Sequence, residues 1–200
     1  RLGWSHGDQE IFSTREMIDL FDPNHLHKSP AVFDTDKLLW LNQHYIKNKN
    51  ISDIADMILP YLEKININVD DRSYLENILR LGIERDYNLK NIALGLTYYF
   101  EEDLNYKSDD FKKLDPIRSK DIINNVIKNI SNIDFTDKEI ISYCIKEVCT
   151  NMKLKFKDIG PVVRFALTSR LKAPSIDELC ITLGKTKTLK RLNDFYIHLG

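Results

Sequence analysis

Apolar residues recur at helical spacing along this whole chain, and residues that can cap a helix precede many of the apolar stretches. In the first half such stretches follow Ser13, Asp34, Ser52, Asp71 and Asn88. The side-chain oxygens of these residues can accept hydrogen bonds from the free N–H groups of a first helical turn. No two segments show the alternation expected of paired strands. The sequence therefore predicts an all-α protein.

The second half of the chain has the same pattern with clearer start and stop signals. Thr136–Glu139 and Ser175–Glu178 have the spacing of capping boxes. Pro161 suits the first turn of a helix, Gly184 suits a helix end, and a last short helix is expected over 189–195. Over the whole chain we expect roughly nine to eleven helices joined by short loops.

One stretch interrupts the periodicity. Residues 101–110 are acidic and carry no strong apolar stripe, so we expect a boundary between two helical lobes there. A helical solenoid or a cage would fit this organisation, although no repeat of about 20–50 residues is visible.

The composition is ordinary for a soluble globular protein, with 42% hydrophobic and 30% charged residues. No apolar run approaches the roughly 20 residues that span a bilayer, and no signal-peptide pattern appears. Cys144, Cys149 and Cys180 form no CxxC pair and lie at apolar helical positions, so buried, reduced thiols are expected. These features predict a cytoplasmic protein without membrane contact. Because the first residue is Arg1 and not Met, we expect a piece of a longer protein.

No catalytic or metal-binding pattern can be assembled from the sequence. The motifs GxGxxG, GxxxxGK[ST], HExxH and GxSxG are absent. His25 and His27 lie close together but lack a third ligand at a suitable spacing. The carboxylate pairs at 70–71 and 109–110 precede helical stretches, where helix capping and solvated charge explain them. We therefore expect no catalytic residue, no metal site and no bound cofactor in this chain.

The charge is distributed unevenly although the formal net charge is only -1. Residues 1–110 carry 12 Lys and Arg against 20 Asp and Glu, whereas residues 111–200 carry 17 against 10. A basic half of this kind attracts a phosphate backbone. The alternative is a chance asymmetry in a neutral protein.

Three groups of basic residues contribute to this excess. They are Lys153, Lys155 and Lys157, alternating with Leu154 and Phe156; Arg164, Arg170 and Lys172; and Lys185, Lys187, Lys190 and Arg191. Arginine and aromatic side chains can bind the splayed bases of an RNA loop, and lysines attract phosphates. Each lysine taken singly can also be an ordinary solvated charge. The groups together favour an RNA-binding surface.

Several segments resemble one known family. They are Arg1–Asp8, Glu10–Phe12, Glu16–Ile18, Ala31–Asp34, Lys37–Asn42, His44–Ile46, Ala166–Thr168, Ala173–Ile176, Leu183–Lys185, Leu189 and Arg191–Leu192. In this order they resemble the part of bacterial glutamyl-tRNA synthetases that follows the catalytic domain. The opening Arg-Leu-Gly-Trp and the later Trp-x-Asn-x-x-Tyr-Ile are specific, whereas residues 50–160 match mainly by helix spacing.

The resemblance implies a fold and an activity. The complete enzyme of this family attaches glutamate to tRNA with ATP and Mg²⁺, in a catalytic domain whose HIGH-like and KMSKS-like motifs are absent from this sequence. The part present would be an anticodon-binding cage of two helical lobes preceded by part of a stem-contact region. The expected divisions are 1–50 for the stem-contact region, 51–106 for the first lobe and 107–200 for the second lobe.

The resemblance also implies tRNA-binding residues. Lys37 and Trp40 match positions near the anticodon stem, although Trp40 can also be a core residue. Arg85 matches an arginine that binds the first anticodon base, and an ion pair with Glu84 or Asp86 is the alternative. Three further matches concern the other anticodon bases: Arg164 would stack on one, and Pro174 and Ile176 would contact the rest.

The sequence departs from the family at three places. Thr168-Ser169 stands where Thr-Gly is usual, Ala173 stands where a hydroxyl residue is common, and Asp86 beside Arg85 is unusual. These departures put in question the turn at Ser169, a side-chain hydrogen bond at Ala173 and the freedom of the Arg85 guanidinium.

The expected partner is tRNA(Glu), bound by a monomer through its anticodon loop and stem. The alternative from another class is an all-α protein–protein adaptor, which predicts an exposed apolar groove. A free-standing enzyme is the third and least supported hypothesis, because no catalytic constellation is present.

Overall fold

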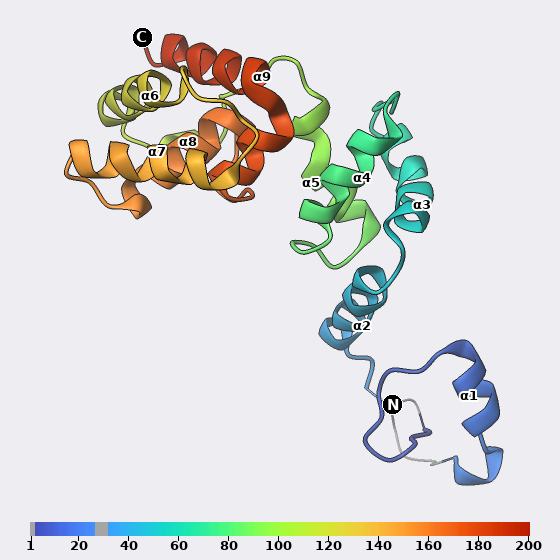
Figure 1. Cartoon of the computed structure of the whole chain (residues 1–200). Helices are drawn as coiled ribbons and strands as arrows, with labels where there is room; N and C mark the ends of the chain where they lie inside the picture. Colours follow the sequence, from blue (N-terminus) through green and yellow to red (C-terminus); the bar gives the residue numbers. More distant parts are fainter. Residues whose placement is uncertain (1–2, 27–31) are drawn as a thin grey trace.

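A computed structural model describes residues 3–26 and 32–200 as helices joined by loops (Figure 1). The elements in these two ranges are α1 (Thr14–Leu20), η1 (Pro23–His25), α2 (Thr35–Lys47), α3 (Ile51–Glu63), α4 (Arg72–Gly82), α5 (Leu89–Phe100), η2 (Phe111–Lys113), α6 (Pro116–Ile130), α7 (Lys138–Asn151), α8 (Phe156–Thr168) and α9 (Ile176–His198). The described ranges hold no strand, only an isolated bridge between His6 and Gln9. The predicted all-α class is confirmed. Arg1, Leu2, His27 and Ala31, on which parts of the sequence analysis rest, lie outside the described residues.

Most of the predicted helix starts are formed by the predicted caps. The Ser13 hydroxyl accepts from the Glu16 N–H at 3.1 Å, and the Glu16 carboxylate accepts from the Ser13 N–H at 2.6 Å. Asp34, Asp71 and Asn88 each accept from the N–H three residues later. These bonds satisfy donors that the helix itself cannot pair.

Three predicted starts were wrong. α3 begins at Ile51 after Asn50, so Ser52 lies inside its first turn. Asp137, not Thr136, caps α7 by accepting from the Glu139 N–H at 2.7 Å. Pro161 lies inside α8, which starts earlier, at Phe156. A proline removes one backbone N–H donor and can stand at more than one position in the early part of a helix. Its position therefore does not identify the first residue of the helix accurately.

The predicted break at Gly184 is confirmed, although the helix that follows is longer than expected. Gly184 has φ +74°, in the left-handed region that favours glycine, and it interrupts the regular course of α9. The segment after it runs to His198 and not only to 195, and it buries Leu192 and Phe195 completely. At the start of α9 the Glu178 carboxylate accepts from the Ser175 N–H, as the capping box predicts.

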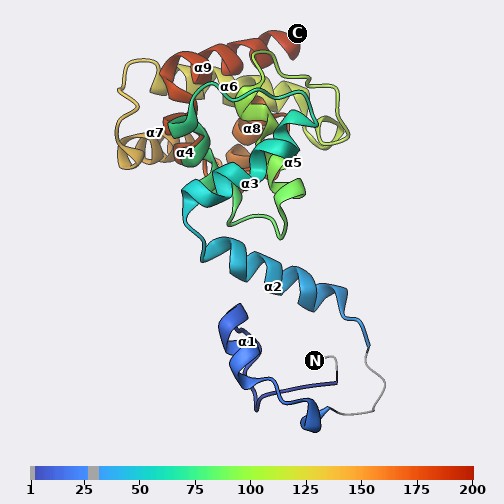
Figure 2. The ribbon, with the colours of Figure 1, turned by 90° about the vertical axis from the view of Figure 1, so that its right-hand side faces the viewer.

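The helices pack in two groups. α3, α4 and α5 contact one another, and α6, α7, α8 and α9 contact one another. The N-terminal segment lies at the end of the elongated molecule opposite the second group (Figures 1 and 2), and α1 has no buried residue. The expected lobe boundaries, 1–50, 51–106 and 107–200, stay predictions.

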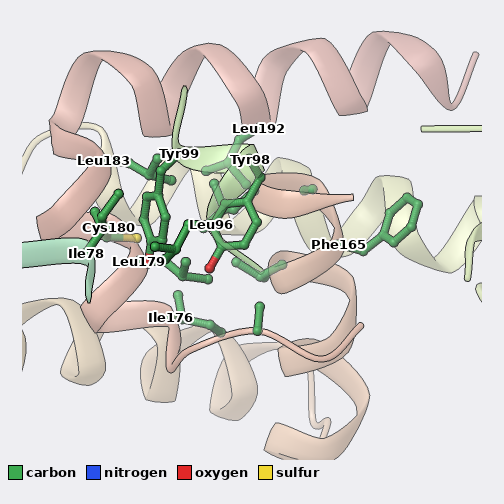
Figure 3. Close-up of a cluster of buried hydrophobic side chains, with 14 of the residues drawn as sticks. Ile78, Leu96, Tyr98, Tyr99, Phe165, Ile176, Leu179, Cys180, Leu183 and Leu192 are labelled. Carbon is green, nitrogen blue, oxygen red and sulfur yellow. The ribbon is translucent and has the colours of Figure 1, made fainter. Parts of the chain in front are cut away.

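The hydrophobic core continues from one group into the other. Figure 3 shows Leu96, Tyr98 and Tyr99 of α5 among side chains of α9 that include Leu179 and Leu183. The three cysteines are unpaired, and Cys144 and Cys180 are buried as predicted, whereas Cys149 is half-buried. Burial raises the pKa of the Cys180 thiol to about 12. Among the described residues, no helix is long and apolar enough to cross a membrane.

A buried arginine joins the two groups of helices. The Arg191 side chain in α9 donates to the carbonyl of Leu167 at 2.6 Å, of Tyr98 at 2.6 Å and of Glu101 at 2.7 Å. Only 1% of Arg191 is exposed, and this burial lowers its pKa. Tyr106 donates its hydroxyl proton to the carbonyls of Ala166 and Arg191 at 3.0 and 3.1 Å. The Arg191 guanidinium of α9 therefore accounts for hydrogen bonds that attach the carbonyl ends of α5 and α8 to α9.

We expect Arg191→Met to lower the free energy of unfolding by about 3 kcal/mol or more, because two buried carbonyl groups and a third in a partly buried bond lose a charged donor. Urea unfolding followed by circular dichroism measures this loss. The matched control is Arg80→Met in the last turn of α4, where the side chain is exposed and a change within about 0.5 kcal/mol is expected. Equal stability of the two variants would contradict the role given to Arg191.

Candidate nucleic-acid interface

A cleft of about 480 Å³ separates the end of α4 and the face of α5 from the segment that connects α8 to α9. Its walls include Arg85 and Asp86 after α4, Tyr98 of α5, and Arg170, Lys172 and Pro174 of the connecting segment. Cationic side chains thus stand on both sides of the cleft, beside an aromatic ring. Such a combination suits an unpaired nucleotide.

Arg85 lies exposed at the edge of this cleft. It makes no ion pair within the described ranges, so the predicted alternative, a salt bridge with Glu84 or Asp86, is not formed. Glu84 pairs instead with Lys47 of α2 at 2.6 Å. The guanidinium of Arg85 therefore keeps its hydrogen-bond donors available.

The loop that carries Arg85 is fixed from behind by α2. The Asn42 side chain donates to the Tyr87 carbonyl at 2.5 Å, and the Gln43 side chain donates to the Asp86 carbonyl at 3.4 Å. Together with the Lys47–Glu84 pair, these bonds hold the loop at both ends. Arg85 is thereby presented on an ordered backbone.

Asp86 introduces a negative charge beside Arg85. Burial raises the pKa of its carboxyl group, and the charge of Arg170 opposes part of that rise. Its carboxylate makes no ion pair in the described part of the chain. Asp86 therefore does not compete for the Arg85 guanidinium in this structure.

Arg164 lies on α8 and is half-buried. Its guanidinium carbon is 5.9 Å from the centre of the Phe156 ring, and its buried Nε has no hydrogen-bond partner. Burial lowers the pKa of Arg164, and the nearby charge of Arg85 lowers it further. The two arginines are thus within electrostatic reach, with no carboxylate bound to either in the described residues.

The segment that closes the cleft is held by its own polar contacts. Arg170 donates to the Leu94 carbonyl and the Thr97 hydroxyl of α5, both at 2.9 Å, and lies 5.5 Å from the centre of the Tyr98 ring. The Leu171 N–H donates to the Asp110 carboxylate at 3.2 Å. These bonds fix the backbone that leads to Pro174.

The structure brings some of the predicted site residues together and separates others. Arg85 and Pro174 line the same cleft, and Pro174 is largely buried in its wall. Ile176 is only 3% exposed and does not line the cleft, so its side chain is part of the core. Ala173 is also buried, at 9% exposure.

Lys37 and Trp40 lie outside the cleft on α2. Lys37 forms an ion pair with Glu10. Trp40 is 46% exposed and its ring lies 6.0 Å from the His44 ring, so the alternative of a core tryptophan is wrong. Both side chains face the surface of the helix that supports Arg85, where they would be accessible to a ligand extending beyond the cleft.

Part of the basic excess predicted to bind RNA is structural. Arg191 is buried, and Arg170 is bonded to α5. Lys187 donates to the Tyr99 carbonyl at 3.1 Å, and Lys190 pairs with Asp103 and Asp194. Lys153, Lys155 and Lys157 remain exposed, with no ion pair in the described ranges.

One aromatic contact was missed by the sequence analysis. Phe156 packs against Arg164, eight residues later on the same helix. The spacing was visible in the sequence, but a helix predicted to start near Pro161 left Phe156 outside it. The ranges 3–26 and 32–200 contain no group of three or more potential metal-binding side chains.

Comparison with known proteins places these features in a family. A family described as an anticodon binding domain matches residues 53–196. The glutamate–tRNA ligase of Lawsonia intracellularis is 38% identical over all of this chain, which covers 43% of that protein. The glutamate–tRNA ligase of Buchnera aphidicola is 34% identical over 97% of this chain and 42% of its own length. The chain thus spans less than half the length of these curated relatives.

Solved structures agree with the sequence relatives. The crystal structure of a glutamate tRNA ligase from Elizabethkingia meningosepticum, in complex with its amino acid, superposes with a TM-score of 0.85 at 29% identity, over all of this chain and 39% of that one. A glutamate-tRNA synthetase from Elizabethkingia anophelis gives a TM-score of 0.78 at 29% identity, over 98% and 38% of the two chains.

We expect Asp86→Asn to raise the free energy of unfolding at pH 7 by a few tenths of a kcal/mol, since the site is only partly buried. Folding raises the pKa of Asp86. The protonated carboxyl group therefore favours the folded state fully below the pKa of the unfolded chain, and this stabilisation is lost as the pH rises through the pKa of the folded chain. At pH 7 the ionised carboxylate is a net cost that the amide removes.

Urea unfolding at pH 7 and pH 4 measures this effect, and the gain should shrink at the lower pH. Asp121→Asn, at an exposed position of α6, is the control and should change stability equally little at both pH values. A loss of stability in Asp86→Asn at pH 7 would contradict the assignment.

Proposed function

Because the chain belongs to the family of anticodon binding domains, we propose that it binds the anticodon arm of tRNA(Glu) as part of a glutamate–tRNA ligase. The similarity to glutamate–tRNA ligases along its whole length supports the choice of this tRNA over others. Attachment of glutamate to the tRNA, with ATP and Mg²⁺, would belong to the remainder of the ligase, since this sequence contains neither catalytic motif of the family.

The observation that carries the proposal is the pair Arg85 and Arg164. Arg85 lines the cleft, the charge of Arg85 acts on Arg164, and no carboxylate is paired with either one in the described structure. Guanidinium groups have only donors, so their complement is a ligand rich in acceptors and negative charge. An unpaired RNA loop supplies both, through base edges and phosphates.

The roles of the individual residues follow from their positions. Arg85 would donate to an anticodon base at the open edge of the cleft. The resemblance implies that Arg164 stacks on a second base; because its guanidinium already lies 5.9 Å from the Phe156 ring centre, we propose that it donates to that base instead. The backbone around Pro174 would contact the remaining base, with Ile176 supporting that backbone from the core. Lys37 and Trp40 would meet the anticodon stem, along the outer side of α2.

The adaptor alternative required an exposed apolar groove. Trp4, Met17, Ile18 and Phe21 do line an apolar hollow of about 450 Å³. That hollow lies outside residues 53–196 and away from the basic cleft, so it does not compete with RNA binding there. We further propose that the chain acts as a monomer in the cytoplasm.

We expect the purified chain to prefer an RNA hairpin with the anticodon arm of tRNA(Glu) over hairpins with other anticodons. Arg85→Ala should weaken that binding by about 1–3 kcal/mol, by analogy with other bidentate arginine–base contacts. Filter binding measures both effects, and affinity should fall steeply with salt because phosphates are bound too.

Arg80→Ala provides the matched control for this experiment. Arg80 is likewise an exposed arginine, in the last turn of α4, but it does not line the cleft, so its loss should leave the preference unchanged. A wild-type chain that binds all hairpins equally, or an Arg85→Ala variant that discriminates as well as wild type, would refute the proposed function.

A further inference from the structure

Three residues on one face of α8 lie in a row that ends at Arg164. Phe156, Gly160 and Arg164 are spaced four residues apart, so they stack one above another along the helix. Side chains of an α-helix point back toward its N-terminus, which directs Arg164 over Gly160 toward the Phe156 ring. The guanidinium carbon is 5.9 Å from the centre of that ring.

Gly160 provides the space in which the ring and the guanidinium meet. A Cβ at this position would lie 3.1 Å from Cε1 of Phe156 and 3.5 Å from Nη2 of Arg164. The backbone at Gly160 is helical and does not itself require glycine. Glycine inside a helix is less stable than alanine by about 0.5–1 kcal/mol, so its presence here is explained by the contact above it.

Phe156 is not a core residue. Phe156 is 48% exposed, whereas other large apolar side chains of α8, such as Phe165, are buried. One side of its surroundings is a hollow of about 290 Å³ shared with Ile145 and Ile176. Its best-defined polar neighbour is the Arg164 guanidinium.

Arg164 differs from the other half-buried and buried arginines of the second helical group. Arg191 and Arg170 use their N–H groups on carbonyl and hydroxyl oxygens. Arg164 has a buried Nε without a partner and no carboxylate bound to it in the described ranges. The face of an aromatic ring attracts a guanidinium cation without accepting a hydrogen bond from the N–H groups of that cation.

We infer that Phe156 is a positioning residue for RNA binding: its ring orients the Arg164 guanidinium so that the terminal N–H groups, and not the buried Nε, meet an unpaired base, and Gly160 makes room for the contact. The base must present acceptors, a carbonyl oxygen or a ring nitrogen, because arginine has only donors. This inference rests on the proposed function, and it assigns to Phe156 no contact of its own with RNA.

A double-mutant cycle tests the inference, with the tRNA(Glu) anticodon hairpin as ligand. Phe156→Ala should weaken binding about three- to tenfold, the range expected for a partly desolvated cation–π contact. In an Arg164→Ala background the same substitution should weaken binding no further, because Phe156 acts through Arg164. Phe156→Tyr, which keeps the ring, should bind within about twofold of wild type.

Gly160→Ala provides a readout that a purely structural role would not move. Alanine favours a helix more than glycine does, so the variant should fold at least as well as wild type and still bind the hairpin more weakly. Tyr61→Ala is the control, since Tyr61 also has a cation, Lys64, 5.7 Å from its ring centre but lies on α3. That variant should bind as wild type does.

The outcomes separate this inference from the proposed function. The inference would be overturned if Phe156→Ala lowered hairpin affinity equally with and without Arg164, or lowered it in neither background. The proposed function would still stand if wild type preferred the hairpin and Arg85→Ala lost that preference. A wild-type chain without any preference for the hairpin would overturn both.

Discussion

The rest of the structure depends on how the Arg191 guanidinium pairs three carbonyl groups, two of them in buried hydrogen bonds and one in a partly buried one. The last carbonyls of a helix have no intrahelical partner, and burying them unpaired is costly. Tyr98 and Glu101 lie at the end of α5, Leu167 lies at the end of α8, and one cation pairs all three. α5 and the segment after α8 form opposite walls of the basic cleft. The hydrogen bonds of Arg191 to α5 and α8 therefore help to determine the shape of that cleft.

The arginines near the cleft fall into two kinds, which differ in whether protein oxygens occupy their donors. Arg191 and Arg170 are bonded to backbone carbonyls and keep helices in place. Arg85 and Arg164 have no carboxylate partner in the described chain, and Arg164 keeps an unpaired Nε. Since a guanidinium stays protonated at any ordinary pH, the acceptors for Arg85 and Arg164 would come from the RNA under the proposed function.

Local signals in the sequence predicted local structure. The caps at Ser13, Asp34, Asp71 and Asn88 each join residues three positions apart, so the local pattern is enough to predict them. The all-α class follows from the same local periodicity.

Contacts between distant residues could not be predicted in this way. Arg191 stands among lysines in a basic stretch, and nothing nearby in the sequence indicates that its partners lie 24 to 93 residues away. The same holds for Arg170, bonded to α5 across more than 70 residues. The family resemblance supplied Arg85, Arg164 and Pro174 as candidate site residues, which stay predictions, and it could not show that Ile176 is buried.

Ser169 stands where the resembled family usually has glycine, and it adopts a backbone conformation that glycine favours. It ends α8 with φ +56°, a left-handed conformation that disfavours residues with a side chain by roughly 1–2 kcal/mol. Its hydroxyl donates to the Asn105 carbonyl at 2.8 Å, a bond of about 0.5–1.5 kcal/mol that glycine could not make. The gain and the cost are therefore similar.

The partner of Ser169 explains why this exchange matters for the cleft. Asn105 precedes Tyr106, whose hydroxyl bonds the carbonyl of Arg191, so the serine attaches the turn to the same segment that the buried arginine organises. The Thr168 hydroxyl accepts from the Arg170 N–H at 3.2 Å and donates to the Arg164 carbonyl at 2.7 Å. The turn thus connects Arg170, whose donors are occupied by protein oxygens, to Arg164, whose guanidinium donors make no hydrogen bond in the described structure. The direction in which each side chain leaves the backbone depends on these hydrogen bonds of the turn, which do not require glycine.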